Sequence, residues 1–236
     1  GLSVTTWALL LIFIGGAGKS AMFPLHIWLP DAMEGPSPVS ALIHAATMVV
    51  AGVFLVARLF PIYALGSDQA LQVIGYVGAF TSLFAAVIAM TQMDFKRVLA
   101  FSTISQIGYM MVGLGVSGYG NEAGLGYMAS MFHLFTHAMF KALLFLCAGS
   151  VIHVVHTNFI NEMGGLRKHM KITHITFLIA TLAIAGFPGF SGFFSKDEII
   201  TAAYHNNKII FYTELLVAGI TAFYMFRLYF RVFWNQ

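Results

Sequence analysis

Hydrophobic residues occur in long runs that are separated by short polar connections. Seven of these runs are long enough to cross a bilayer, because a helix needs about 20 apolar residues to span roughly 30 Å of hydrocarbon. The runs lack strand-like alternation, and backbone groups in lipid must be satisfied within the spanning structure. The pattern therefore predicts an all-α, polytopic bundle of transmembrane helices. The expected crossings cover residues 3–22, 38–60, 70–91, 97–117, 124–152, 172–203 and 209–233.

Two of the expected crossings are interrupted in the same way. In residues 14–24 a cluster of glycines is followed by Lys19 and then by Pro24. In residues 185–196 glycines flank Pro188, and Lys196 comes directly after them. Paired Gly/Pro interruptions are typical of transporters that are built from repeats and bind their substrate at broken helices. We therefore expect two discontinuous helices, each with a lysine beside its break.

The composition agrees with a membrane location. Hydrophobic residues make up 59% of the chain and charged residues only 9%, whereas soluble domains carry about 25% charged residues. The only cysteine, Cys147, excludes a disulfide framework and a cysteine-ligated metal or iron–sulfur cluster. The net charge of +3 is small and dispersed, which argues against nucleic-acid binding. Lipid is therefore the expected surrounding for most of the chain.

Basic residues collect in alternate connections. The positive-inside rule places the richer set on the cytoplasmic face of an inner (plasma) membrane, with a mitochondrial or thylakoid membrane as the alternative. The richer set is Lys96, Arg97, Arg167, Lys168 and Lys171, with Arg231 near the end of the last crossing, and the opposite set is Arg58 and Lys208.

The most informative polar residues are His133, His137 and Lys141. They are spaced four residues apart, so they share one face of a helix and rise about 12 Å along it. Ionisable groups at membrane depth cost at least about 2.5–3.5 kcal/mol each and suggest function. Imidazole exchanges protons near neutral pH, and a lysine in a low dielectric can become neutral. The row predicts proton transfer along the membrane midplane; the alternative is two hydrogen-bonded core histidines and a snorkelling lysine.

Other polar residues extend the candidate site. Lys19 and Lys196 are expected within the bilayer beside their helix breaks, although a lysine can also cap a half-helix. His44 lies about two turns inside an apolar run, where a hydrogen-bonded core histidine is the competing interpretation. Metal binding is not expected, because the two i, i+4 histidines lack a third ligand. Four carboxylates are candidates for gating or for pairing with the lysines, or are solvated loop charges: Asp31, Glu34, Asp197 and Glu198.

Several motifs resemble the antiporter-like membrane subunits, and most closely the large distal membrane subunit of respiratory complex I. They cover nearly the whole chain and are long enough to exclude chance. They are PLHIWLPDAMEGP at 24–36, SALIHAATMV at 40–49, FHLFTHAMFKALLF at 132–145, MGGLR at 163–167 and GFFSKDE at 192–198.

The resemblance implies a core of two inverted five-helix repeats, each with one broken helix. Residues 1–60 would be the last two helices of the first repeat, and residues 61–236 the second repeat. The N-terminal helices of the first repeat, including one that supplies a glutamate partner for the lysine, and the C-terminal lateral helix would lie outside this chain. The family's proton relay would map onto Lys19, His44, His133, His137, Lys141 and Lys196.

The family relation further implies a subunit of proton-pumping NADH:quinone oxidoreductase, a translocase with no redox centre in this chain. NADH, FMN, iron–sulfur clusters and quinone would be bound by other subunits, and the partners would be other membrane-arm subunits, lipid and protons. Two alternatives are an ion-exchange subunit of a multisubunit Na⁺/H⁺ antiporter or a membrane hydrogenase, which share this core. A third is a membrane scaffold that conducts nothing, which leaves three buried lysines unexplained.

Overall fold

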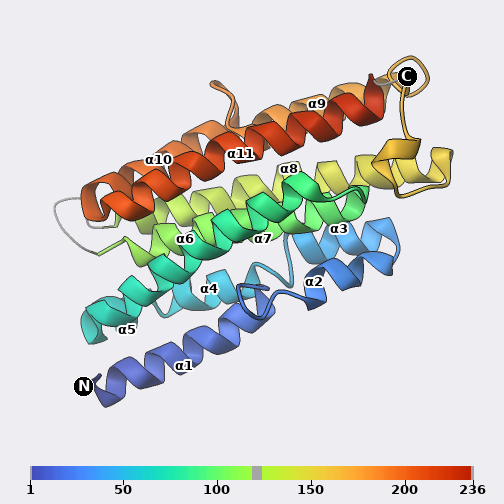
Figure 1. The fold of residues 1–236 in the computed structure, drawn as a ribbon. Helices are drawn as coiled ribbons and strands as arrows, with labels where there is room; N and C mark the ends of the chain where they lie inside the picture. The colour runs from blue at the N-terminus through green and yellow to red at the C-terminus, as the bar shows by residue number, and fades with distance from the viewer. Residues whose placement is uncertain (1, 119–123, 235–236) are drawn as a thin grey trace.

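The chain forms a bundle of helices that run roughly along one direction (Figure 1). The computed structural model describes residues 2–118 and 124–234, so the connection after residue 118 lies outside the described residues. Two short 3₁₀ turns, Ala32–Glu34 and Ile160–Glu162, lie in connections. The α-helices are α1 (Val4–Lys19), α2 (Trp28–Asp31), α3 (Ser37–Ala45), α4 (Ala51–Arg58), α5 (Phe60–Gly66), α6 (Asp68–Thr91), α7 (Phe95–Gly115), α8 (Leu125–Val155), α9 (Lys171–Ala185), α10 (Ser191–Asn206) and α11 (Lys208–Phe233).

Four crossings are single helices. Among the described residues, α6, α7, α8 and α11 are long and apolar enough to span a membrane. They match the runs predicted at 70–91, 97–117, 124–152 and 209–233 within a few residues. The chain is therefore a multi-pass membrane protein, as its hydropathy predicts.

The other three crossings are discontinuous. The two predicted interruptions are present, since α1 ends at Lys19 before a non-helical stretch that leads to α2, and α9 and α10 are separated by residues 186–190. A third interruption, at residues 46–50, divides the crossing predicted at 38–60 into α3 and α4. Residues 46–50 contain neither glycine nor proline, so the sequence carries no local signal for this break.

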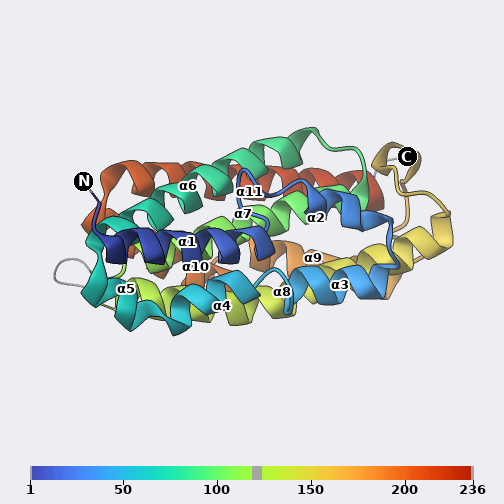
Figure 2. The same cartoon turned by 90° about the horizontal axis from the view of Figure 1, so that it is seen from below.

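Helix α7 is the centre of the bundle. Every residue of α7 apart from Arg97 is buried, and Figure 2 shows α7 between α6 and α11 on one side and α8 on the other. Helices α6 and α7 approach closely through glycines: a Cβ atom added to Gly108 would lie 2.7 Å from the Gly78 carbonyl oxygen. Small residues permit such close helix packing in membranes. Polar groups on α7 therefore face the interior of the protein.

The richer set of basic residues lies in or beside the connections from α6 to α7 and from α8 to α9, and these connections are at one end of the bundle, on the right in Figure 1. Lys96 donates hydrogen bonds to the carbonyls of Met33 and Gly35, at 3.4 and 2.9 Å, and Arg231 donates to Asn161. Lys208 begins α11 at the opposite end. This arrangement agrees with the predicted charge asymmetry between the two faces.

A buried row of protonatable side chains

The predicted ladder on α8 lies on one buried face of the helix. His133, His137 and Lys141 are each 0% exposed. The imidazole ring centroids of His133 and His137 are 6.4 Å apart. Helix α8 packs against α7, α3, α9 and α10, so this face is enclosed by protein rather than lipid. The spacing of four residues therefore places the three groups together, as predicted.

His133 is held by side chains of two other helices. Its Nε2 lies 3.0 Å from Gln106 Oε1 on α7, and its Nδ1 lies 2.7 Å from Ser195 Oγ on α10. An amide oxygen only accepts hydrogen bonds, so Nε2 donates to Gln106 and Nδ1 of the neutral ring accepts from Ser195. The Ser195 hydroxyl is also 3.4 Å from the Gly192 carbonyl. It can therefore turn toward that carbonyl and accept from Nδ1 when His133 is protonated.

Lys141 lies one turn beyond His137 and is equally enclosed. Its Nζ donates to Ser102 Oγ on α7 at 2.8 Å and lies 5.9 Å from the centroid of the Phe145 ring. The electrostatic interactions of Lys141 reach His44, His137 and Lys196. A charge at Lys141 therefore influences the neighbouring members of the row.

The break between α9 and α10 positions Lys196. Gly186 ends α9 with a φ of 78°, which glycine adopts without strain. A Cβ atom on Gly192 would lie 1.9 Å from the Ala183 carbonyl oxygen, so only glycine permits this approach of α10 to α9. Lys196 is 3% exposed, and its Nζ donates to the Ile184 carbonyl at 2.6 Å. The carbonyl freed by the helix break thus binds the lysine amine.

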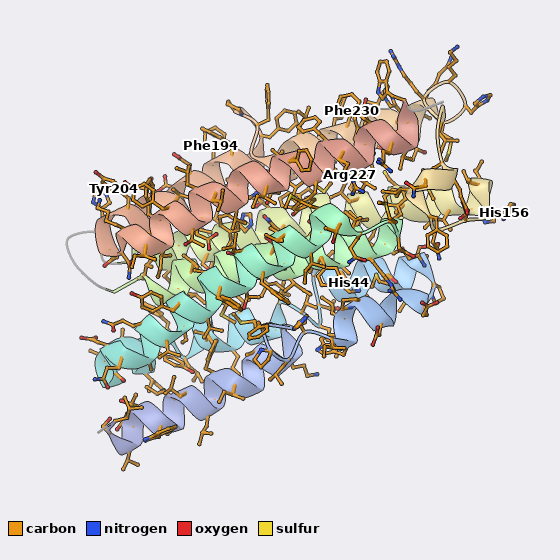
Figure 3. All side chains as sticks on the ribbon, viewed as in Figure 1. His44, His156, Phe194, Tyr204, Arg227 and Phe230 are labelled. Atoms are coloured by element: carbon orange, nitrogen blue, oxygen red, sulfur yellow. The ribbon has the colours of Figure 1, made fainter. Side chains whose placement is uncertain are left out.

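His44 joins the row from α3, which packs against α8 (Figure 3). Its ring stacks on Phe145 with centroids 5.0 Å apart. Neither ring nitrogen of His44 has a hydrogen-bond partner among the described side chains and backbone groups, and the ring of His137 interacts with the backbone of Ala45. Buried polar atoms are normally paired. The hydrogen-bonded core role that was the alternative for His44 therefore has no partner among the described residues, and its relay role stays a prediction.

Lys19 and the loop carboxylates are not brought into this row. Lys19 is exposed at the end of α1, and Asp31, Asp197 and Glu198 are exposed as well. Glu34 is 3.8 Å from Arg97, with both side chains partly or largely exposed. Within residues 2–118 and 124–234, none of the four carboxylates forms an ion pair with a lysine. Their gating role, and the relay role of Lys19, stay predictions.

The structure adds polar residues that the sequence analysis did not select. Ser102, Gln106 and Ser195 contact the row directly, but serine and glutamine are common in helices and carry no distinguishing pattern. Glu214 is 0% exposed in α11 and accepts a hydrogen bond from Ser82 at 2.7 Å. An acidic residue inside the apolar run 209–233 was the available signal for Glu214. No group of three metal-ligating side chains occurs in the described part of the chain.

Comparison with curated proteins identifies similar chains in bacteria and archaea. The chain is 54% identical to NAD(P)H-quinone oxidoreductase chain 5 of Picosynechococcus sp. over 94% of its length. It is 56% identical to F(420)H(2) dehydrogenase subunit L of Methanosarcina mazei over 94% of its length. It is 52% identical to NADH-quinone oxidoreductase subunit L of Neisseria meningitidis over 99% of its length. The chain spans 34% of the length of each of these relatives.

Two solved structures have the same fold. The membrane-bound sulfane sulfur reductase, an archaeal respiratory complex, contains a chain that matches with a TM-score of 0.87 and 30% identity, over 95% of this chain and 46% of that chain. The Mrp complex of Dietzia sp. matches with a TM-score of 0.87 and 27% identity, over 98% and 42%. The transmembrane profile described as NADH:quinone oxidoreductase/Mrp antiporter matches residues 2–221. The chain therefore belongs to the NADH:quinone oxidoreductase/Mrp antiporter transmembrane family.

Proposed function

We propose that this chain is part of a proton-translocating membrane-arm subunit of NADH:quinone oxidoreductase. The observation that carries the proposal is the row of fully or almost fully buried groups that begins at His44 on α3, follows α8 and ends at Lys196 on α10. Its members come from three helices and interact through hydrogen bonds, ring contacts or charge. The similarity to quinone oxidoreductase subunits supports the redox-linked version of this function.

Charge repulsion between two lysines couples proton uptake by one lysine to proton release from the other. Lys141 and Lys196 are both buried, and two ammonium groups at short range in a low dielectric disfavour each other. Protonation of one lysine therefore promotes release from the other. His133 lies between them in the network, because it contacts Ser195, the residue before Lys196, and shares its helix face with Lys141. Its two-sided hydrogen bonding suits it to pass a proton in either direction.

The rest of the assignment follows the family relation. Residues 1–60 form the last two helices of a first five-helix repeat and residues 61–236 form a second repeat, with Lys19 at the broken helix of the first. Asp31 and Glu34, near the end of the bundle that carries Lys96, and Asp197 and Glu198, beside Lys196 in α10, modulate proton access. The redox reaction and its cofactors, NADH, FMN, iron–sulfur clusters and quinone, belong to partner subunits.

A related redox partner is the second candidate. The relative from Methanosarcina mazei is named as an F(420)H(2) dehydrogenase subunit and is 56% identical. The relay in this chain contains no group that distinguishes one remote electron donor from another. The Mrp likeness at 27% identity supports the shared fold, and sodium-driven exchange without an electron donor would identify that function instead.

The decisive experiment uses the intact complex that contains this chain, reconstituted into liposomes. We expect NADH or F(420)H(2) oxidation to drive proton movement, and Lys141→Ala to reduce that movement about tenfold or more, because a positioned proton carrier contributes at least that much. Lys168→Ala is the matched control, since Lys168 is an exposed lysine in the connection before α9.

The outcomes separate the functions clearly. Loss of proton movement in Lys141→Ala with normal behaviour of Lys168→Ala supports the relay. Undiminished proton-to-electron stoichiometry and turnover in Lys141→Ala would contradict it. Proton movement that requires sodium and no electron donor would replace the redox-linked function with ion exchange.

A further inference from the structure

Glu214 is a fully buried carboxylate that the relay from His44 to Lys196 does not use. It lies six residues into α11, about 9 Å from the start of the helix, and is 0% exposed. Its Oε1 accepts a hydrogen bond from Ser82 Oγ at 2.7 Å. Its Oε2 has no hydrogen-bond partner among the described residues. A carboxyl group that served only to join two helices would be paired on both oxygens.

Glu214 lies next to the last member of the relay. Tyr109 connects the two residues, because its hydroxyl donates to the Glu214 backbone carbonyl at 2.5 Å and its ring lies 5.1 Å from Lys196 Nζ. No ion pair joins the two side chains among the described residues, and the charges of Glu214 and Lys196 attract each other at longer range. Lys196 is ten residues before the end of α10, about 15 Å deep, so Glu214 lies between Lys196 and that end of the bundle.

A cavity opens from the same end toward Glu214. It has a volume of about 240 Å³ and is lined by residues of α6, α7, α10 and α11. At its mouth Asn207 Nδ2 donates to Tyr76 Oη at 2.7 Å. Ile210 lines the cavity and lies one turn before Glu214, on the same face of α11. Gly75 lines it from α6, two turns before Ser82.

Ile210 lies between the cavity and the acid along α11. It is 3% exposed, and its Cδ1 lies 3.4 Å from the position of a Cβ atom on Gly75. From the mouth inward come Asn207 and Tyr76, then Ile210 and Gly75, and one helical turn further along α11 Glu214. This mouth lies at the Lys208 end, opposite the lysine-rich connections (Figure 1).

We propose that Glu214 is an additional proton-carrying residue, which accepts a proton from Lys196 and releases it into the cavity between α6, α7, α10 and α11. The inference rests on the proposed function and extends it by one site. In the first step the Lys196 ammonium becomes a neutral amine and the Glu214 carboxylate becomes a carboxylic acid. In the second step the acid loses its proton to water at the cavity, past Ile210. Ser82 orients the carboxyl group and stabilises the anion by its hydrogen bond.

The test compares Glu214→Gln with Glu162→Gln in the intact complex in liposomes. Glutamine keeps the size of the side chain and the Ser82 contact but cannot carry a proton. Glu162 lies in an exposed connection at the other end of the bundle and undergoes the same chemical change. We expect Glu214→Gln to lower proton movement per assembled complex about tenfold or more, and Glu162→Gln to leave it unchanged.

The design keeps the two proposals distinct. If the unaltered complex moves no protons, or Lys141→Ala has no effect, the proposed function fails. If Lys141→Ala loses proton movement while Glu214→Gln retains the full rate, the relay stands and Glu214 is excluded from it.

If the Glu214→Gln chain does not assemble into the complex, a second measurement tests the proposal without that variant. The infrared band of the Glu214 carboxyl group is identified because it shifts in the Glu214→Asp variant. The rate at which this carboxyl group exchanges hydrogen for deuterium is then followed in the intact complex. Ile210→Ala removes the side chain between cavity and acid, so exchange should become several-fold faster than in the unaltered chain. Equal exchange rates would overturn the proposed release route.

Discussion

The two interrupted crossings that carry lysines have similar sequences and different surroundings. In both, glycines and a proline occur near the end of an apolar helix and a lysine lies beside the break, although in the first crossing the glycines are within α1 itself. Lys196 is enclosed, and its amine is bound by the Ile184 carbonyl. Lys19 is exposed, and no hydrogen bond or ion pair of its side chain occurs among the described residues.

The difference between Lys19 and Lys196 shows which properties of a broken helix depend on local sequence and which depend on the surrounding helices. At these two breaks the local signal is glycine and proline, which remove backbone constraints or hydrogen bonds over a few residues. The burial of the lysine follows from the helices that pack over it, and α10 contacts α7, α8, α9 and α11. Helix α1 packs on α4, α5 and α6 and leaves Trp7 and Leu11 exposed, an apolar face suited to lipid or other helices. Within this chain, which spans 34% of the length of its relatives, similar local sequence is thus enclosed by helices in the second region and not in the first.

The largest expected loss of proton movement comes from replacing the lysine beside one of the two breaks, Lys196 or Lys19. Lys196→Ala should reduce proton movement by the intact complex about tenfold or more, because Lys196 is enclosed, is bound by the Ile184 carbonyl of α9 and lies over the Tyr109 ring of α7. Lys19→Ala should reduce it less, since no described group binds the Lys19 amine. Proton movement and donor oxidation are measured together in liposomes. Equal losses in the two variants would show that the enclosed and open breaks are equivalent in the assembly.

A smaller effect tests the glycine that closes the second break. Gly192→Ala places a Cβ atom 1.9 Å from the Ala183 carbonyl oxygen, so the start of α10 must move away from α9. We expect a loss of stability of about 1–3 kcal/mol, typical of overpacking, seen as a lower midpoint temperature of thermal inactivation. Gly15→Ala is the control in the first region, where an added Cβ atom meets nothing within 4 Å. If Gly192→Ala left the midpoint temperature of thermal inactivation unchanged, the approach of Gly192 to the Ala183 carbonyl would not be tight.

The smallest effect concerns the exposed carboxylates near the two breaks. Glu34→Gln removes the exposed ion pair with Arg97 and should change the free energy of unfolding by less than about 1 kcal/mol. Glu198→Gln tests the second region, where the carboxylate is also exposed. Proton movement should stay within about twofold of the unaltered complex in both. A larger loss in either variant would assign that carboxylate to gating.

Much of this architecture could be predicted because its signals are short-range. Hydropathy located the crossings, glycines and Pro188 located the break before Lys196, and the four-residue spacing placed His133, His137 and Lys141 on one buried face. The break between α3 and α4 could not be predicted, since residues 46–50 lack a helix-breaking residue and the interruption depends on packing against other helices.

The partners of the row depend on contacts between distant parts of the chain. Gln106 and His133 are 27 positions apart, and Ser195 and His133 are 62 apart, so no local pattern connects them. The exposure of Lys19 is a tertiary property as well. Glu214 was detectable as an acid in an apolar run, but its relation to Lys196 emerges only when Tyr109 brings α10 and α11 together.

The second turn of α10 has a mechanical consequence. Ser195 and Lys196 are adjacent, yet the first is attached to His133 on α8 and the second to Ile184 on α9. A tilt of this turn relative to α9, across the connection where Gly186 and Gly189 adopt positive φ, would strain both attachments in one movement. Proton loading on α8 and release from α10 are then linked by position as well as by charge. A conformational signal arriving from a neighbouring subunit would need to move only this single turn to reset both.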